Sequence, residues 1–211
     1  MMTPSDTAQL GVVGVVLAGG LSRRMGGGDK GLLELDGRPI LDHVLERLRP
    51  QVRMMVLNAN GEPARFDRWR LPVAPDVLPN NPGPLVGILT GLDWVVANLP
   101  GLEWIVSVPT DAPFLPHDLV ARMLAAVEEQ GSDMACAVSN GQRHPVVGLW
   151  SVAHRMELRY ALIEEGVRKV DAWTGRYKVA DVEFSTDPVD PFFNANDEND
   201  LAEAQKLAQG H

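Results

Sequence analysis

The side chains of this sequence best suited to chemistry are the basic residues of a glycine-rich stretch at positions 17–31. Arg23, Arg24 and Lys30 supply positive charge, and the glycines around them let backbone N–H groups come close to an anion. The stretch follows Val12–Leu17, an apolar run rich in β-branched residues that predicts a buried strand. The economical interpretation is a loop that wraps the phosphates of a nucleotide.

Two better-known phosphate loops do not fit this stretch. A Walker A loop needs a lysine followed by Ser or Thr, whereas Lys30 precedes Gly31. Residues 26–31 match G-x-G-x-x-G formally, but they lie nine residues beyond the strand and lead into residues 32–37 instead of a helix. A surface loop without a ligand is the remaining alternative, and the direct exit from a buried strand argues against it.

A second candidate is the carboxylate of Asp111. Residues 104–108 form a continuous apolar run that predicts a central parallel strand, and Pro109 ends it, so Asp111 lies at the ligand-facing strand end. A hard carboxylate suits Mg²⁺, which typically takes one or two protein carboxylates together with substrate phosphate oxygens. The competing interpretation is a helix N-cap, but Pro113 and Pro116 make Asp111 an awkward helix start.

Three further positions follow predicted strands or open a helix. Residues 54–57 predict a short strand that delivers Asn58 to its carboxyl end, where it could contact a base or a sugar; an ordinary turn asparagine is the alternative. From the residues alone, Asp76 is a loop acid. Gly83 lies in turn sequence that feeds a helix, where small residues let a ligand approach the N-terminal N–H groups; a plain loop is the alternative.

The second half of the chain offers weaker candidates. Residues 141–145 predict a turn between strands at 134–138 and 146–150. His144 has no Ser, Cys or second His in triad or metal spacing, so a general base or a zinc ligand is poorly supported, whereas a basic tip that touches a phosphorylated acceptor stays open. Asn196 has the residue type of a helix N-cap.

Composition limits the function classes. There are 28 acidic and 19 basic residues, and the net charge of −9 argues against a general nucleic-acid binder. Cys136 is the one cysteine and lies in an apolar run, so we expect a buried structural thiol and a reducing cytoplasm. No basic segment precedes the first apolar run, and no stretch approaches about 18 apolar residues, so we expect a soluble, unexported protein.

Predicted strands alternate with predicted helices along the chain. Apolar residues at helical spacing predict helices over about 39–49, 84–99, 118–130 and 154–165. No repeat and no Ser/Gly-rich linker is visible. We therefore expect an α/β fold: a single three-layer α/β/α domain over residues 1–211, with a Rossmann-like sheet that is mainly parallel but mixed.

Several segments together resemble the nucleotidyltransferases that join a nucleoside monophosphate to a phosphorylated acceptor. The resemblance is closest to the molybdenum cofactor guanylyltransferases and covers nearly the whole chain. It departs from the family pattern after Asn196, where Asp197-Glu198 replaces the usual Thr-Pro. The segments that carry it are Leu17-Ala18-Gly19-Gly20, Arg23-Arg24-Met25-Gly26, Asp29-Lys30-Gly31, Asn58-Ala59-Asn60, Pro82-Gly83-Pro84-Leu85-Val86-Gly87, Thr110-Asp111-Ala112-Pro113, Arg143-His144-Pro145 and Phe192-Phe193-Asn194-Ala195-Asn196.

The resemblance implies a nucleotidyltransferase fold with a GTP-binding half, about 10–115, and an acceptor-binding half, about 116–211. It implies transfer of GMP from GTP to molybdopterin, release of pyrophosphate, and Mg²⁺ bound by Asp111. Backbone N–H groups of residues 17–20 are expected to hold the nucleotide. Catalytic roles fall on Arg24, Lys30 and Asp111, GTP contacts on Leu17, Ala18, Gly19, Gly20, Arg24, Lys30, Asn58, Asp76, Gly83 and Asp111, and acceptor contacts on Arg143, His144, Asn194 and Asn196.

Three other functions stay open on the sequence. A cytidylyltransferase of the same fold would keep the loop and the metal-binding acid but change the base contacts. A sugar-phosphate or isoprenoid nucleotidyltransferase would accept a different phosphorylated partner, and a nucleotide- or molybdopterin-binding carrier would bind without catalysis. Other cofactor-biosynthesis or molybdoenzyme-maturation proteins are compatible partners, whereas nucleic acid and membranes are not expected.

Overall fold

The computed structural model describes residues 11–18, 29–78, 83–195 and 198–209. Within them, seven strands form one sheet in the order β5-β4-β1-β6-β8-β7-β9, and β2 and β3 form a separate ribbon. The strands are β1 Val12–Leu17, β2 Glu34–Leu35, β3 Arg38–Pro39, β4 Met54–Asn58, β5 Val73–Ala74, β6 Trp104–Pro109, β7 Met134–Ser139, β8 Gln142–Ser151 and β9 Val179–Phe184. The helices are η1 Lys30–Leu32, α2 Ile40–Leu48, η2 Arg49–Gln51, η3 Pro63–Trp69, α3 Pro84–Asn98, α4 Leu119–Gln130, η4 Val152–His154, α5 Arg155–Ile163, α6 Val170–Thr174 and α7 Glu198–Gln209.

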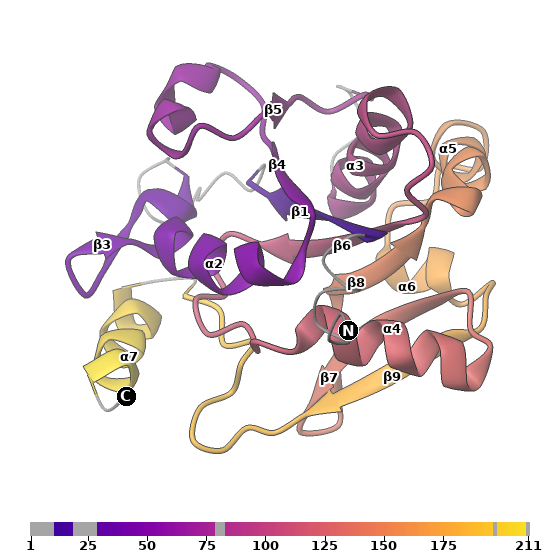
Figure 1. Cartoon of the computed structure of the whole chain (residues 1–211). Helices are drawn as coiled ribbons and strands as arrows, with labels where there is room; N and C mark the ends of the chain where they lie inside the picture. Colours follow the sequence, from indigo (N-terminus) through magenta and orange to yellow (C-terminus); the bar gives the residue numbers. More distant parts are fainter. Residues whose placement is uncertain (1–10, 19–28, 79–82, 196–197, 210–211) are drawn as a thin grey trace, which may run out of the picture.

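Helices cover both faces of the sheet (Figure 1). α2 and α4 contribute to the hydrophobic core on one face, and α3, α5 and α6 contribute to the core on the other. α7 lies beside the ribbon of β2 and β3 (Figure 1). The expected three-layer α/β/α fold with a mixed sheet is confirmed.

The sequence of α2 explains its place on the sheet. Its apolar residues recur at helical spacing, and Leu41, Val44 and Leu48 are completely buried. The helix begins directly after Pro39, whose fixed φ suits a helix start. The helix expected over about 39–49 is confirmed to within a residue at each end.

Two glycines let α3 lie very close to the sheet. A Cβ on Gly91 would be 2.4 Å from Cγ2 of Val15 in β1, and a Cβ on Gly87 would be 2.4 Å from Oδ1 of Asn58 in β4. Real Cβ atoms do not approach other atoms so closely, so glycine is required at both positions. The first turns of α3 therefore pack directly on the end of β4.

The strand directions bring several strand ends to one edge. β4, β1 and β6 are parallel, and Leu17 pairs with both Asn58 and Pro109, the last residues of β4 and β6. β5 is also parallel to β4, with Ala74 opposite Asn58. β8 is antiparallel to both β6 and β7, and β9 is parallel to β7. The carboxyl ends of all strands except β8 therefore share one edge, where ligands bind in α/β sheets.

The turn between β7 and β8 lies earlier in the chain than the sequence analysis placed it. Asn140-Gly141 has φ values of +49° and +71°, the conformation of a two-residue hairpin for which Asn-Gly is a preferred sequence. The turn predicted over residues 141–145 is therefore wrong, because β8 already begins at Gln142. Arg143 and His144 are consequently strand residues near the turn, and their side chains project from β8.

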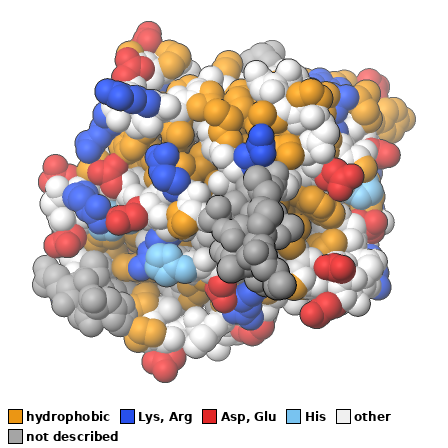
Figure 2. All heavy atoms as spheres, viewed as in Figure 1, with side chains coloured by type: hydrophobic (Ala, Val, Ile, Leu, Met, Phe, Trp, Pro, Cys, Tyr) orange, Lys and Arg blue, Asp and Glu red, His pale blue; other side chains and the backbone are white. Residues whose placement is uncertain are grey.

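Charges are mixed on the face of the molecule that Figure 2 shows. Lys and Arg side chains are interspersed there with Asp and Glu, in keeping with the acidic net charge of −9. None of the helices in the described part of the chain has the length and apolar character needed to cross a membrane.

Candidate functional site

Lys30 and Asp111 form an ion pair although 81 residues separate them in the sequence. Nζ of Lys30 lies 3.1 Å from Oδ2 of Asp111, and the two side chains are 22% and 14% exposed. Lys30 begins η1, and Asp111 follows the carboxyl end of β6. The structure therefore brings the cation and the acid singled out in the sequence together, partly shielded from water, at the ligand-binding edge of the sheet.

A glycine makes this approach between η1 and the end of β6 possible. A Cβ on Gly31 would lie 2.9 Å from Cβ of Thr110, closer than real Cβ atoms approach each other. Gly31 is buried, so η1 packs directly on the residue that precedes Asp111. This packing places the ammonium group of Lys30 within reach of the carboxylate.

The side-chain amides of two asparagines hold Asp76. Nδ2 of Asn58 donates a hydrogen bond to Oδ1 of Asp76 at 2.8 Å, and Nδ2 of Asn60 donates to Oδ2 at 2.7 Å. The backbone N–H of Asp76 donates to Oδ1 of Asn60 at 2.9 Å. We call Asn58, Asn60 and Asp76 the asparagine clamp. No role was predicted for Asn60, although residues two apart in an extended segment, such as Asn58 and Asn60, point to the same side.

The exit from β1 and the start of α3 border the clamp. The backbone N–H of Ala18, directly after Leu17, donates to the carbonyl of Asn58 at 2.8 Å. In this structure the N–H of Ala18 therefore extends the pairing of β1 with β4, and its contact with the nucleotide stays a prediction. Gly83 precedes α3 with φ +122°, a conformation that favours glycine. Four predicted site residues lie outside the described residues: Gly19, Gly20, Arg24 and Asn196.

Three polar side chains form a hydrogen-bonded chain between β7, β8 and the segment after β9. Oγ of Ser139 lies 2.7 Å from Nε2 of His144 and 3.0 and 3.1 Å from the two carboxylate oxygens of Asp190. The sequence spacing did not indicate this contact, which arises because the Asn140-Gly141 turn pairs Ser139 with Gln142, and His144 lies two residues further along β8. No local pattern marks Asp190, which is 51 residues from Ser139 in the sequence.

The order of these three groups differs from that of a nucleophilic triad. An ionised carboxylate only accepts hydrogen bonds, so the hydroxyl proton of Ser139 goes to Asp190, and Nε2–H of His144 donates to Oγ. In a triad the imidazole lies between the hydroxyl and the carboxylate. Ser139 is 1% exposed, and burial lowers the pKa of His144 while the charges of Asp190 and Glu183 partly oppose this. The arrangement therefore suits a positioning role rather than attack by the hydroxyl.

The segment that carries Asp190 returns to Asp111. The backbone N–H of Phe192 donates to Oδ1 of Asp190, and the ring of Phe192 lies 4.7 Å from the imidazole of His144. The backbone N–H of Ala195 donates to the carbonyl of Asp111 at 3.0 Å. Asn194, an exposed residue, is therefore next to a direct backbone contact with Asp111.

Arg143 points away from this group. Adjacent residues of a strand face opposite sides of the sheet, and Nε of Arg143 lies 2.7 Å from Oδ1 of Asp181 in β9. The structure therefore does not bring Arg143 together with His144. Cys136 also lies on the side of Arg143, and burial raises the pKa of its thiol to about 12, so it stays protonated at neutral pH.

The donor set at Asp111 fits one kind of metal site. No group of three or more His, Cys, Asp or Glu residues in the described segments is arranged to hold a metal ion. A single carboxylate beside a lysine instead suits Mg²⁺ that is held largely by phosphate oxygens and water. Metal binding at Asp111 would therefore depend on a bound polyphosphate.

These features define an α/β protein whose candidate residues gather at the carboxyl edge of the sheet, where ligands bind in such folds. Residues 14–179 match the family model described as MobA-like NTP transferase domain. A relative named molybdenum cofactor guanylyltransferase from Bradyrhizobium sp. (strain ORS 278) is 54% identical over 207 residues, covering 98% of this chain and 97% of the relative. One of the same name from Nitrobacter hamburgensis is 52% identical, covering 92% of this chain and 93% of the relative. The chain therefore belongs to the MobA-like NTP transferase family, among the molybdenum cofactor guanylyltransferases.

Solved structures agree on the fold. Molybdopterin-guanine dinucleotide biosynthesis protein A from Archaeoglobus fulgidus superposes with a TM-score of 0.73 at 23% identity, covering 94% of this chain and all of that one. A 4-diphosphocytidyl-2C-methyl-D-erythritol synthase from Anaerococcus prevotii reaches a TM-score of 0.69 at 12% identity, covering 94% of this chain and 98% of that one. Because proteins with such different names share this fold, the fold alone does not determine the base or the acceptor.

Proposed function

We propose that this chain transfers the GMP part of GTP to molybdopterin, with or without molybdenum, and releases pyrophosphate. The observation that carries the proposal is the Lys30–Asp111 ion pair, which lies at the ligand-binding edge of the sheet. The backbone carbonyl of Asp111 also accepts a hydrogen bond from Ala195, in the segment before α7. Relatives that are at least 50% identical over at least 92% of this chain carry the name of that activity.

The reaction depends on alignment and charge neutralisation. An oxygen of the acceptor's phosphate monoester attacks the α-phosphorus of GTP. The bond from the α-phosphorus to the oxygen that bridges it to the β-phosphate breaks, and pyrophosphate leaves with the bonding electrons. A phosphate monoester is already largely deprotonated near neutral pH, so the reaction needs no general base. The repulsion between two anions is the main barrier that the protein has to lower.

Lys30 and Asp111 divide the electrostatic work. The ammonium group of Lys30 neutralises negative charge on the triphosphate and on the departing pyrophosphate. Arg24, assigned from the sequence, adds to that charge. Asp111 is the residue that would hold Mg²⁺, and the bound ion supplies a positive charge that offsets developing charge on phosphate oxygens. Without a nucleotide, Lys30 and Asp111 neutralise each other and keep both side chains in place.

The two substrates occupy different parts of the sheet edge. The amides of Asn58 and Asn60 orient the carboxylate of Asp76. Its oxygens also accept hydrogen bonds from the N–H or hydroxyl donors of guanosine. His144 and Asn194 lie on or beside the segment that contacts Asp111, and they receive the acceptor. The reaction takes place in the cytoplasm, with other cofactor-biosynthesis or molybdoenzyme-maturation proteins as partners of its product.

Pyrophosphate release tests this proposal. Purified protein is incubated with molybdopterin and each of the four nucleoside triphosphates, with Mg²⁺ or with EDTA. We expect rapid release with GTP and Mg²⁺, little with CTP, and none with EDTA. A preference for CTP would indicate a cytidylyltransferase, and release only with a sugar phosphate or isoprenoid phosphate would indicate another acceptor class. GTP binding without release under any condition would indicate a carrier and overturn the proposal.

A further inference from the structure

Arg65 connects the residue that precedes Lys30 with the segment that follows β4. Its Nε donates to the carboxylate of Asp29, and one terminal nitrogen donates to the carbonyl of Asn60 at 2.6 Å. The other terminal nitrogen donates to the carbonyl of Glu62. The guanidinium carbon also lies 4.5 Å from the ring centroid of Phe66, a buried residue of η3. Arg65 is thus fixed by three hydrogen bonds and a ring contact.

Each partner of Arg65 adjoins a residue of the candidate site. Asp29 directly precedes Lys30, which pairs with Asp111. Asn60 is part of the asparagine clamp and donates to Asp76 at 2.7 Å. One guanidinium group therefore links Lys30 and Asp76, each through one intervening residue: Lys30 through Asp29, and Asp76 through Asn60.

The chemistry of this junction requires arginine. The guanidinium group has five N–H donors in a rigid plane, so it can serve three acceptors in fixed directions, whereas a lysine ammonium group is a single point on a flexible stem. The Arg65 and Asp29 side chains are only 26% and 14% exposed. Because water screens the pair incompletely, it constrains the loops more than an exposed ion pair would.

We propose that Arg65 is a positioning residue that couples the loop carrying Lys30 to the asparagine clamp, so that triphosphate and nucleoside are held in one register. This inference rests on the proposed function for its kinetic consequence, but the coupling of the two loops is a property of the chain itself. Arg65 acts on the nucleotide through Asp29 and Asn60, and the acceptor side of the site is independent of it.

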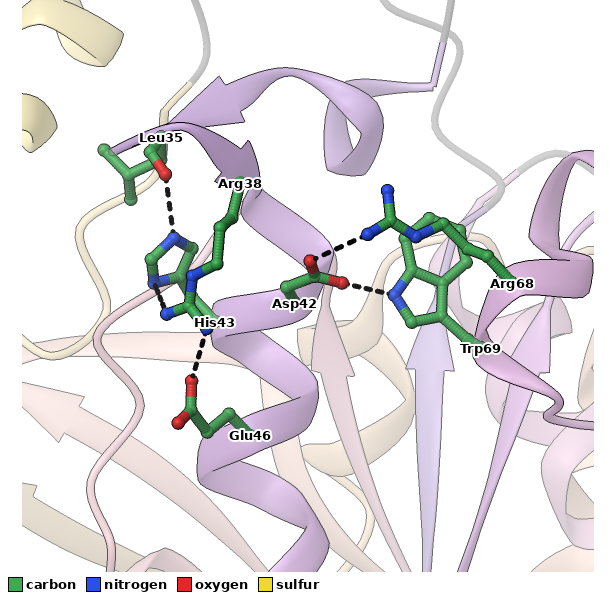
Figure 3. A network of polar contacts seen from close by, with 7 residues as sticks. All are labelled: Leu35, Arg38, Asp42, His43, Glu46, Arg68 and Trp69. Atoms are coloured by element: carbon green, nitrogen blue, oxygen red, sulfur yellow. Dashed lines mark hydrogen bonds and ion pairs between the residues drawn. The ribbon is translucent and has the colours of Figure 1, made fainter.

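Arg68 provides a matched control in the same helix. It also pairs with an aspartate, Asp42 at 3.3 Å, and its guanidinium carbon lies 5.0 Å from the ring centroid of Trp69. Figure 3 shows Arg68 and Trp69 next to Asp42 near the start of α2, where Trp69 also donates a hydrogen bond to Asp42. The side chain of Arg68 is 59% exposed, and both its hydrogen bond and its ion pair are made to Asp42. Arg68 therefore has the same charge as Arg65, lies in the same helix and also contacts an aromatic ring, but it does not connect the Lys30 loop with the asparagine clamp.

Two measurements on full-length protein separate coupling from general stability. The first is steady-state kinetics of Arg65→Ala, Arg65→Lys and Arg68→Ala. We expect Arg65→Ala to lower kcat/KM for GTP by about tenfold to a hundredfold, with KM for the acceptor within about twofold of wild type. Arg65→Lys should restore only part of the loss, because it keeps the charge but not the three directed bonds. Arg68→Ala should resemble wild type.

The second measurement is amide hydrogen exchange without ligand. The N–H of Leu33 donates to the carbonyl of Lys30 at 3.1 Å, and the N–H of Ala59 donates to that of Ala74 at 3.1 Å, so both loops contain amides protected by local structure. We expect Arg65→Ala to speed exchange at least about fivefold in residues 29–33 and in 58–62 together, and Arg68→Ala to leave both unchanged.

The outcomes distinguish this inference from the proposed function. Exchange that stays at the wild-type rate in either loop of Arg65→Ala overturns the coupling. Faster exchange with unchanged kcat/KM for GTP overturns the positioning role. If wild-type protein does not use GTP at all but both loops respond to Arg65→Ala and not to Arg68→Ala, the proposed function fails and the coupling stands.

Discussion

The two sides of the sheet edge are built in different ways. On the nucleotide side, β5, β4, β1 and β6 are parallel neighbours, and the candidate residues follow strand ends or the loop after β1. On the acceptor side, the antiparallel strand β8 interrupts the order, and the candidates come from the start of that strand and from the segment after β9.

This difference is also one of chemistry. The nucleotide side carries the ion pair of Lys30 with Asp111 and, in the asparagine clamp, the carboxylate of Asp76 held by two neutral amides. The acceptor side carries a neutral imidazole, a buried hydroxyl and an aromatic ring that fix a segment of chain. We infer that the first side supplies most of the rate enhancement and the second side mainly positions the acceptor, and the following predictions test this division.

The largest effect is expected from Lys30→Ala. Loss of a charge stabiliser in such a site typically lowers the rate about a hundredfold or more, so kcat for pyrophosphate release should fall at least that far. Lys178→Ala is the matched control, because Lys178 donates to a backbone carbonyl at an exposed position. Thermal unfolding should show both variants folded, and near-normal turnover by Lys30→Ala would remove the basis for placing the chemistry on the nucleotide side.

A smaller effect is expected from Asp76→Asn. In the wild type, both carboxylate oxygens of Asp76 accept hydrogen bonds, one from Asn58 and one from Asn60. Asparagine at position 76 has only one side-chain oxygen, so one of these two donors loses its acceptor, and such a loss costs about 1–3 kcal/mol. We expect KM for GTP to rise about tenfold while kcat at saturation changes little. Initial rates at varied GTP and a fixed concentration of acceptor measure this KM. An equal rise in the KM for the acceptor would contradict the division of roles between the two sides.

Ser139→Ala should weaken binding of the acceptor and leave binding of GTP unchanged, which is the reverse of the effect expected from Asp76→Asn. The variant breaks the link from His144 to Asp190 and frees the segment before α7, at a cost of about 1 kcal/mol. Acceptor KM should rise about fivefold and GTP KM should stay constant. Ser151→Ala, which removes a hydroxyl at the other end of β8, is the control. An increase in the KM for GTP would instead show that the two sides do not act separately.

The smallest effect concerns pH. Burial lowers the pKa of His144 in the folded protein, so the unfolded chain binds a proton more readily below about pH 6.5. This contribution to stability is fully present above that pH and is lost as the pH falls through the unfolded and then the folded pKa. Between pH 7.5 and pH 5, wild type should lose more Tm than His144→Gln, by on the order of a degree. The reverse order would contradict the environment assigned to His144.

Sequence patterns predicted well where the strands on the nucleotide side end, because strand ends are encoded locally. An apolar run followed by a polar residue marks the ends of β4 and β6, and hence Asn58 and Asp111. The fold class could be predicted from the alternation of strands and helices for the same reason. The close approach of Lys30 to Asp111 depends in addition on the packing of Gly31 against Thr110, which no local pattern encodes.

The remaining features depend on contacts between distant residues. Asp190 meets Ser139 across 51 positions and Arg65 meets Asp29 across 36, and no periodicity encodes such pairs. The position of His144 on a strand was predictable in principle, because Asn140-Gly141 is a hairpin signal that the sequence analysis overlooked. Loop contacts of this kind require the three-dimensional arrangement of the sheet.

The central claim is that one ion pair, Lys30 with Asp111, marks the place where the magnesium-bound triphosphate reacts. Its most direct test is Mg²⁺-dependent pyrophosphate release by Asp111→Ala, compared with Asp118→Ala, which removes an aspartate that makes no capping contact at the start of α4. With saturating GTP and molybdopterin, we predict that Asp111→Ala falls at least about a hundredfold below wild type while Asp118→Ala retains wild-type turnover. Near-normal, Mg²⁺-dependent turnover by folded Asp111→Ala would contradict the account.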